Sequence, residues 1–325
     1  MTEEIEVLNK NGNKTKKPIE LNKLTCTCGF DYDIGHLPFF IVTKKSSGRR
    51  EIKFKYVKWV FLSGDFPNYN DLDTLLGIVR LYQLKLSSGE VLETNIINKR
   101  KIIQVDISGR KLCDYVGKKQ NGKNIDRINK SMERLTSLVV YKKTYTNKTV
   151  TEFETIRLIV DYGWIEKSNG HRLIRISIDE NFLEECIEKN QRVRFQAIQN
   201  ITGQVSKGCL FYLDCNNKSA KQWISERKLF RFLGLDYPKI PKISTKDDKL
   251  TVAKLMKNYK AEVKQYNKKA RTLRLDVHES LYKLKSNKLI SDWKFRHILV
   301  RQRDVNFYLI FKSNYYIKTK NPSKN

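Results

Sequence analysis

The sequence has no apolar run near the roughly 18 to 20 residues that a membrane-spanning helix needs. Its opening, MTEEIEVLNKNGNKTKK, also lacks the charged start and apolar segment of a secretory signal. The six cysteines are scattered over 325 residues, unlike the dense pattern of a disulfide-stabilised secreted domain. We therefore expect a cytoplasmic protein with no membrane partner, whose cysteines are free thiols.

The signatures of several enzyme classes are also missing. No Gly-rich loop ends in Gly-Lys-Ser/Thr, as a nucleotide-driven motor would require. None of the four histidines belongs to the His-x-His pair expected of a metal-dependent nuclease that nicks one strand through a tyrosine. Cys26, Cys28 and His36 are spaced C-x-C-x7-H, but zinc takes four ligands and no second pair is nearby. The carboxylates of residues 179–188 are typical of a solvated connector helix. We expect no catalytic residue, no metal and no cofactor.

Acidic residues are few relative to basic ones. The chain has 35 Asp and Glu against 64 Lys and Arg, which gives a net charge of +29. A folded chain of this charge repels itself unless its partner is a polyanion, and nucleic acid is the leading candidate. Hydrophobic residues (40%) and aromatic residues (11%) suffice for real cores, which disordered basic tails lack. The length favours two domains.

Hydrophobic periodicity predicts the elements of a first domain. The polar first 25 or so residues are expected to be disordered. HLPFFIV (36–42) and REIKFKYVKWVFL (50–62) favour two strands of a hairpin joined by KKSSGRR. Three helices should follow: one from a cap at Asn70 or Asp71, one between Ser108 and Gly117, and one beginning at 122–124. β-rich runs come after them, and helix, helix, helix, hairpin is the order of a winged helix.

A similar order returns further along the chain. Residues 206–217 predict a helix, 221–225 a strand, 225–235 and 270–290 two helices, and 292–313 a hairpin. The Pro-broken loop and Lys-rich helical segment over 236–269 are predicted to be an insertion. The expected fold is α+β, with two tandem winged-helix domains (helix-turn-helix plus β-hairpin wing) and a disordered N-terminal arm. We assign residues 1–35 to the arm, 36–190 to the first domain and 191–325 to the second, which carries the insertion.

Each domain then contains a candidate DNA-reading helix, because the second helix of a helix-turn-helix lies in the major groove. In the first domain, apolar residues at steps of 3, 4 and 3 should face the core; these are Ile125, Ile128, Met132 and Leu135. In the second, Leu273, Val277, Leu281 and Leu284 should do the same. The side chains predicted to contact DNA lie opposite and on the second hairpin: Lys123, Arg127, Lys130, Ser131, Arg134, Arg271, Arg274, His278, Lys285, Lys294, Arg296, Arg301 and Arg303. Arginines suit forked contacts to guanine or phosphate, and lysines suit neutralisation of the backbone. The alternative is a solvated basic face in a chain that is basic throughout.

Four segments carry a resemblance to a known family. They are HLPFFIVTKK, INKSMERLTSLVVYKK, LIRISIDENFLEECIEKNQRVRF and GCLFYLDCNNKSAKQWISERKLFRFLGL, within residues 36–235. In element order and apolar pattern the chain resembles bacterial plasmid replication initiators, the Rep proteins of the replication initiator protein A type. The resemblance implies binding to repeated double-stranded origin sites, opening of an adjacent AT-rich duplex, and recruitment of the host replicative helicase and initiator. It also implies a homodimer that represses its own promoter.

Three other functions stay open at this point. A winged-helix transcription regulator or autorepressor would use the same modules without a role in replication. A strand-nicking enzyme is disfavoured because the metal-binding histidines are missing. A structural nucleoid protein would bind all sequences alike, with a steep salt dependence.

Overall fold

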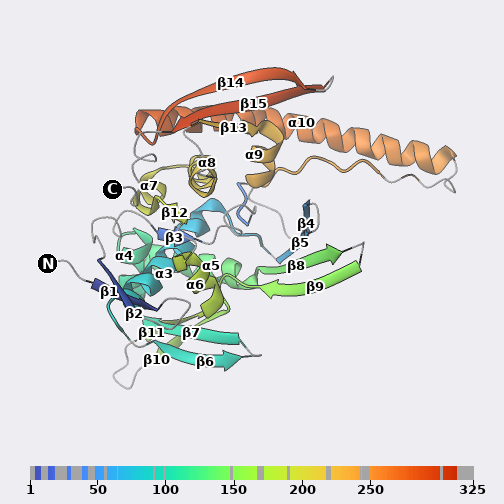
Figure 1. The fold of residues 1–325 in the computed structure, drawn as a ribbon. Helices are drawn as coiled ribbons and strands as arrows, with labels where there is room; N and C mark the ends of the chain where they lie inside the picture. The colour runs from blue at the N-terminus through green and yellow to red at the C-terminus, as the bar shows by residue number, and fades with distance from the viewer. Residues whose placement is uncertain are drawn as a thin grey trace. The chain divides into compact units, whose positions relative to one another are not determined.

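The computed structural model describes residues 4–8, 14–18, 28–30, 39–42, 48–54, 57–63, 65–90, 92–97, 100–146, 149–166, 172–188, 191–216, 221–241, 243, 249–300 and 303–312. They form a mixed α and β fold (Figure 1). The chain divides into two compact units. The first comprises Met1–Gly35 and Thr43–Ile201, and the second comprises His36–Val42 and Thr202–Asn325.

In the first unit, α3 (Tyr69–Ser87) is the central helix. The other described helices of this unit surround it; they are α4 (Gly109–Val116), α5 (Gly122–Ser137), α6 (Glu180–Glu188) and α7 (Phe195–Asn200). α3 is apolar on most sides and contacts the other four, as expected of a helix buried in a core. Leu72, Leu76 and Val79 on this helix are fully buried.

The ends of these helices follow ordinary capping chemistry. The Ser108 hydroxyl accepts a hydrogen bond from the Lys111 N–H at 3.3 Å, and α4 ends at Gly117 with a left-handed φ of 71°. Both positions confirm the sequence prediction. The cap of α3 is Asn68, however, rather than Asn70 or Asp71. Asp71 is the third helical residue and completes a capping box, a role the sequence pattern allows but the prediction missed.

Two four-stranded antiparallel sheets complete the first unit. One has the order β4 (Gly48–Phe54), β5 (Val57–Ser63), β8 (Val139–Thr146) and β9 (Thr149–Ile156). The other has the order β10 (Asp161–Glu166), β11 (Arg172–Asp179), β7 (Arg100–Ile107) and β6 (Glu93–Ile97). The buried Tyr82 hydroxyl lies 3.1 Å from the Ile103 carbonyl oxygen and 2.6 Å from that of Ile176, which fixes α3 against β7 and β11.

The predicted first hairpin is wrong. β4 pairs instead with β5, and both strands lie largely within REIKFKYVKWVFL. HLPFFIV instead belongs to the second unit, where Phe39, Phe40 and Ile41 are buried. A continuous apolar run of this kind fills a core from all sides, whereas a half-exposed strand alternates.

Short strands account for the described part of the segment predicted to be a disordered arm. β1 (Glu4–Leu8) pairs antiparallel with β2 (Lys14–Pro18), and β3 (Cys28–Phe30) pairs with β12 (Gln191–Val193). At these strands the structure differs from the prediction. The remainder of residues 1–35 lies outside the described residues.

The second unit has helices on one face of a three-stranded sheet. Its elements in chain order are α8 (Gln204–Cys215), β13 (Lys221–Ser225), α9 (Glu226–Phe232), α10 (Lys249–Ser286), β14 (Ile290–Val300) and β15 (Arg303–Lys312). The sheet order is β13-β15-β14, all antiparallel. This agrees with the element order predicted for 206–313. Leu281, Leu284, Tyr308 and Ile310 lie in its core.

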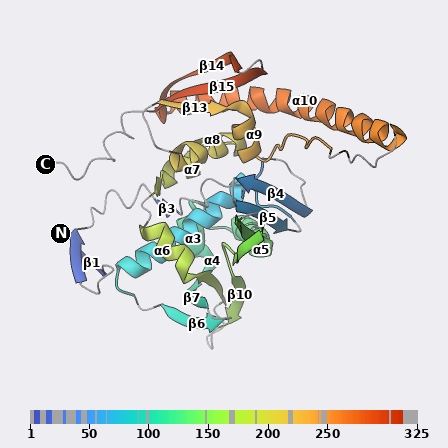
Figure 2. The ribbon, with the colours of Figure 1, turned by 45° about the vertical axis from the view of Figure 1, so that its right-hand side comes forward.

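α10 is one uninterrupted helix, where the sequence pattern predicts two. It contains neither Gly nor Pro over its 38 residues, the residues that most often interrupt a helix. The Lys-rich segment predicted as an insertion and the predicted recognition helix are therefore the two halves of a single rod. In both ribbon views the N-terminal half of this helix projects past the β14–β15 sheet (Figures 1 and 2).

The first unit ends at Ile201, whereas the predicted boundary between the domains lies between residues 190 and 191. α7 explains the assignment of residues 195–200 to the first unit. The Arg80 guanidinium lies 4.8 Å from the centre of the Phe195 ring, and Gln199 Nε2 donates to the Tyr115 carbonyl at 3.1 Å.

Candidate nucleic-acid interface

The inner side of α5 is built as the sequence predicts. Asn121 caps the helix, with its Oδ1 accepting a hydrogen bond from the Asn124 N–H at 2.9 Å. Ile128, Met132 and Leu135 are buried, whereas Ile125, predicted to face the core with them, is half-buried. The helix packs against α3 and α4. Because these apolar residues fix the rotation of α5, they also determine which side chains can face solvent.

Three basic side chains point away from the core on this helix. Lys123, Arg127 and Lys130 are exposed. Arg127 Nη1 makes only a long contact of 3.4 Å to Asn124 Oδ1 on its own helix, and neither lysine has an ion-pair partner in the part of the chain that is described. Their charges are available to an external anion.

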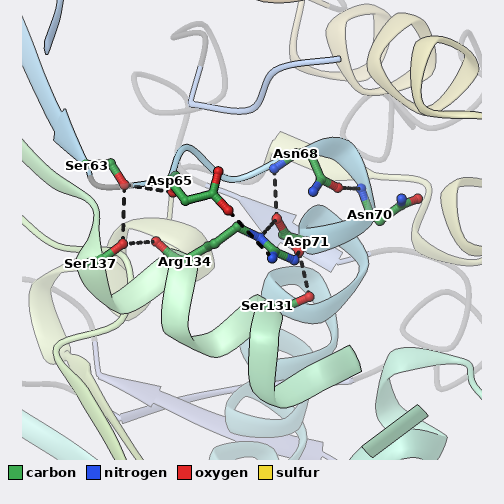
Figure 3. Close-up of polar contacts among 8 residues, drawn as sticks. All are labelled: Ser63, Asp65, Asn68, Asn70, Asp71, Ser131, Arg134 and Ser137. Carbon is green, nitrogen blue, oxygen red and sulfur yellow. Dashed lines mark hydrogen bonds and ion pairs between the residues drawn. The ribbon is translucent and has the colours of Figure 1, made fainter. Parts of the chain in front are cut away.

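Two other predicted DNA contacts on α5 are engaged inside the protein. The Ser131 hydroxyl donates to Asp71 Oδ1 at 2.6 Å. The Arg134 guanidinium bonds the same carboxylate twice, from Nε to Oδ2 at 2.8 Å and from Nη2 to Oδ1 at 2.6 Å (Figure 3). The hydrogen bond to Asp71 is the main reason that the pKa of Arg134 is raised. We call Asp71, Ser131 and Arg134 the α3–α5 clamp.

The clamp begins at the N-terminus of α3. Asp71 Oδ2 also accepts the Asn68 backbone N–H at 2.8 Å, and Asn68 Oδ1 accepts the Asn70 N–H at 2.8 Å (Figure 3). A carboxylate suits this position because unpaired N–H groups make the start of a helix electropositive. Asp71 is completely buried, so its four hydrogen bonds compensate the cost of burying its charge. The clamp therefore sets the orientation of α5 against α3.

In the second unit, the C-terminal half of α10 is arranged in the same way. Val277, Leu281 and Leu284 are fully buried and Leu273 nearly so, as predicted. Arg271 is exposed. Arg274 is tied to Glu226, the first residue of α9, from Nε to Oε2 at 2.6 Å and from Nη2 to Oε1 at 2.8 Å. The pKa of Arg274 is raised chiefly by this hydrogen bond.

His278 is packed among aromatic rings. Its ring centre lies 5.0 Å from that of Trp293, 5.2 Å from that of Phe295 and 5.7 Å from that of Tyr308. Burial lowers the pKa of His278, and the charge of Arg274 lowers it further, while Glu226 acts in the opposite direction. The histidine thus joins α10 to the sheet.

The predicted residues of the second hairpin are more dispersed. Lys285 Nζ pairs with Asp292 Oδ1 at 2.9 Å at the start of β14. Lys294 and Arg296 are exposed on β14. Arg303 lies on β15 opposite Val300, without a described side-chain position, and Arg301 lies outside the described residues.

The projecting half of α10 adds a basic surface that is not among the predicted DNA contacts. Its exposed lysines are Lys254, Lys257, Lys260, Lys264, Lys268 and Lys269. From Lys254 to Arg271 they extend over about 26 Å at 1.5 Å per residue. The signal was present, because apolar residues continue at steps of 3 or 4 through Val252, Leu255, Tyr259, Val263, Tyr266, Ala270 and Leu273. A period that crosses residue 269 without interruption indicates one helix.

The described part of the chain contains no group of three or more His, Cys, Asp or Glu side chains that could hold a metal ion. Cys113, Cys186, Cys209 and Cys215 are buried and do not form disulfide bonds, and Cys26 and His36 lie outside the described residues. None of the described helices is both long and apolar enough to cross a bilayer.

Comparisons with known proteins place the fold. No protein-family model and no curated protein matches the chain. The crystal structure of domains 2 and 3 of RctB is similar, with a TM-score of 0.50 at 13% identity, covering 89% of this chain and 100% of that one. A selenomethionine derivative of the same RctB domains gives 0.48 at 12% identity, covering 85% of this chain and 94% of that one. The Pi initiator protein in complex with iteron DNA gives 0.38 at 11% identity, covering 75% and 94%. The first of these similarities establishes a shared fold.

Proposed function

We propose that the protein is a plasmid replication initiator that binds repeated sites in double-stranded origin DNA. The observation that carries the proposal is that each unit holds a helix with one side packed in the core and an exposed basic side. The net charge of +29 makes a polyanionic partner the natural one. The fold shared with the RctB domains and the resemblance of residues 36–235 to the Rep proteins support the same function.

We further propose that both units are winged-helix modules. In the second unit the order α8, β13, α9, α10, β14, β15 is that of a winged helix, with α10 as the reading helix and β14–β15 as the wing. In the first, α3, α4 and α5 precede the β8–β9 hairpin. Each reading helix would lie in a major groove. Two linked modules raise the effective concentration of the second to about the millimolar range, so modest individual affinities suffice.

The contacts within the chain suggest a division of labour among the predicted residues. Lys123, Arg127 and Lys130, with Arg271 in the second unit, are free to contact bases and phosphates. Arg134 and Arg274 instead position the helices through their carboxylate partners, Asp71 and Glu226. Lys294 and Arg296 on β14 would contact phosphates from the wing.

Origin opening, recruitment of the host helicase and homodimer formation are part of the proposal through the resemblance alone. We also propose that the protein acts by binding rather than by catalysis, in the bacterial cytoplasm. Incubation with supercoiled plasmid and Mg²⁺ should then leave the plasmid intact. Relaxed or nicked product would contradict this part of the proposal.

Selection from a pool of short duplexes at about 150 mM salt tests the central claim. Sequencing of the retained DNA should yield a motif of repeated blocks about one or two helical turns apart. Retention of all sequences alike, fading together as salt rises, would identify a nonspecific architectural protein instead.

Variants of exposed arginines then test the reading helices. Arg127→Ala and Arg271→Ala should each weaken binding to the selected duplex by about 5- to 150-fold, because one forked base contact discriminates by ~1–3 kcal/mol. Binding to random duplex should change far less. Arg157→Ala removes the same charge from an exposed position outside both helices and is the control. Equal losses for specific and random DNA would remove α5 and α10 as base readers.

Maintenance of a plasmid separates an initiator from a transcription regulator. A plasmid carrying the selected repeats beside an AT-rich segment should replicate only when the protein is supplied. Binding to the repeats without replication would leave only the regulator.

A further inference from the structure

The three-stranded sheet of the second unit has an open face whose composition is unusual for a protein surface. Strand alternation sends one set of side chains toward α10 and the other away from it. Ile224, Tyr308 and Phe295 form one row across the sheet, and the last two contact His278 of α10. The intervening residues must therefore lie on the opposite face.

That opposite face is aromatic at its centre. The register places Trp223, Leu309 and Lys294 in one row, Lys221, Phe311 and Asp292 in the next, and Ser225, Phe307 and Arg296 in the third. Trp223 is 53% exposed, and Phe307, Leu309 and Phe311 are half-buried. The Trp223 and Phe307 rings meet edge to face with their centres 6.2 Å apart. We call these rows the outer sheet face.

Basic side chains surround the rings on both edge strands. Lys221 on β13 and Lys294 and Arg296 on β14 are exposed. Lys221 Nζ lies 5.6 Å and Lys294 Nζ 5.9 Å from the centre of the Phe311 ring. The one acidic residue in these rows, Asp292, is already paired with Lys285. The face thus combines a flat apolar surface with an excess of basic over acidic side chains.

These two properties select one class of ligand. Duplex DNA offers charge but keeps its bases stacked inside, so it cannot use exposed rings on a flat sheet. Unpaired bases can stack on aromatic side chains while lysine and arginine follow the phosphates. We propose that the outer sheet face binds single-stranded nucleic acid, with Trp223 as the main stacking residue.

The outer sheet face lies on the side of the sheet opposite to the proposed reading helix α10, and it includes Lys294 and Arg296, which the proposed wing would also use to contact duplex phosphates. The single-strand proposal rests on the proposed function only because each requires a nucleic-acid partner. For an initiator, such a face would hold one strand of an opened duplex while the reading helices stay on their sites.

Binding of a labelled 20-nucleotide oligothymidine, which contains no duplex, tests the proposal at about 150 mM salt. Trp223→Ala should weaken oligothymidine binding by about 10-fold, the loss typical for one stacked base, and leave binding of a random 20-base-pair duplex within about 2-fold. Trp223→Phe should retain most of the affinity, since the ring is kept. Trp164→Ala is the matched control, because Trp164 on β10 is 50% exposed and lies in the other unit. Unchanged circular dichroism spectra would show that the variants fold.

Two further readouts bear on the same face. Oligothymidine should quench tryptophan fluorescence less in Trp223→Phe than in Trp164→Phe. Replacing Lys294 and Arg296 by Gln should reduce the slope of log affinity against log salt by about 0.7 for each lost phosphate contact.

Several outcomes would overturn the proposal. The first is that Trp223→Ala binds oligothymidine with the native affinity. The second is that this variant loses equal affinity for oligothymidine and for duplex. The third is that Trp223→Ala converts a dimer to a monomer without any change in oligothymidine binding. The last would make the face an interface between copies. These results do not depend on the selection from the duplex pool, which tests the proposed function. That selection can succeed or fail whether or not Trp223 binds single strands.

Discussion

Arg134 and Asp71, 63 residues apart in the sequence, are joined by two parallel hydrogen bonds, and Asp71 is completely buried. The pair makes α5 and α3 one rigid body, so the exposed basic residues of α5 are held at a fixed angle. The helical position of Arg134 predicts a DNA contact, but this residue instead fixes the orientation of the exposed basic residues on α5.

Removal of Arg134 should destabilise the first unit. Arg134→Met leaves the buried Asp71 charge without its main partner, and we expect the free energy of unfolding to fall by about 3 kcal/mol, the low end for a broken buried pair. The low end applies because the Arg134 side chain is 22% exposed. Denaturant unfolding followed by circular dichroism measures the change. Arg127→Met, on the exposed side of the same helix, should stay within about 0.5 kcal/mol of the native protein, and equal effects for the two would contradict the role of the clamp.

Arg274 and Arg271 should differ in the same sense. Arg274→Met breaks the two bonds to Glu226 and should lower the free energy of unfolding by about 1.5–3 kcal/mol, the range for hydrogen bonds to charged groups. Arg271→Met should leave stability unchanged and weaken DNA binding. Thermal unfolding and duplex binding of both variants give the comparison. A loss of stability in Arg271→Met would show that Arg271 stabilises the fold despite its exposure.

The stability of the second unit should depend on pH through His278. Folding lowers the pKa of this histidine below its ordinary 6.5, so the unfolded chain binds the proton more tightly. The resulting stabilisation is present above pH 6.5 and is lost as the pH falls below this value. His278→Phe should flatten the dependence of the unfolding midpoint on pH between 7.5 and 5.5. The exposed His297 supplies the control in His297→Gln, and a variant His278→Phe that keeps the full pH dependence would refute the assignment.

Gly234 should not tolerate a side chain. It has a φ of +97°, and an added Cβ would lie 2.6 Å from Ile41 Cγ2 and 2.7 Å from Ile41 Cβ. Gly234→Ala combines backbone strain of about 1–2 kcal/mol with a clash of similar cost. Gly89 has a φ of +74° with no neighbouring atom within 4 Å, so Gly89→Ala should show the backbone cost alone. Differential scanning calorimetry of the two variants should separate the backbone strain from the clash. Equal decreases in the unfolding temperature would mean that Ile41 moves aside at no measurable cost.

Local signals in the sequence predict the helices well, because caps and apolar spacing are properties of neighbouring residues. Ser108 and Gly117 bound α4 as expected, and the buried side of α5 is correct. β6 and β7 were not predicted, although Ile103, Val105 and Ile107 alternate toward the core. The extra buried Ile102 obscures this period.

The partners of the basic residues could not be predicted in the same way. Helical spacing places Arg134 and Arg274 on polar sides, but Asp71 and Glu226 approach them from 63 and 48 residues away. Only the packing of α3 on α5, and of α9 against α10, decides which arginines remain exposed. The charge of the chain thus predicts the class of ligand and leaves the contacting residues undetermined.

Phe39, Phe40 and Ile41 lie in the core of the second unit, yet a ribosome makes them about 160 residues before the rest of that core. Phe40 packs against Phe211 of α8, and Ile41 lies against Gly234, which follows α9. Until those residues are made, these apolar side chains are exposed to chaperones or to incorrect contacts. Completion of the second unit must wait for the whole first unit to be translated. A fragment that begins at Thr202 would lack three buried side chains of its own core, so the two halves of this protein cannot be separated by a single cut.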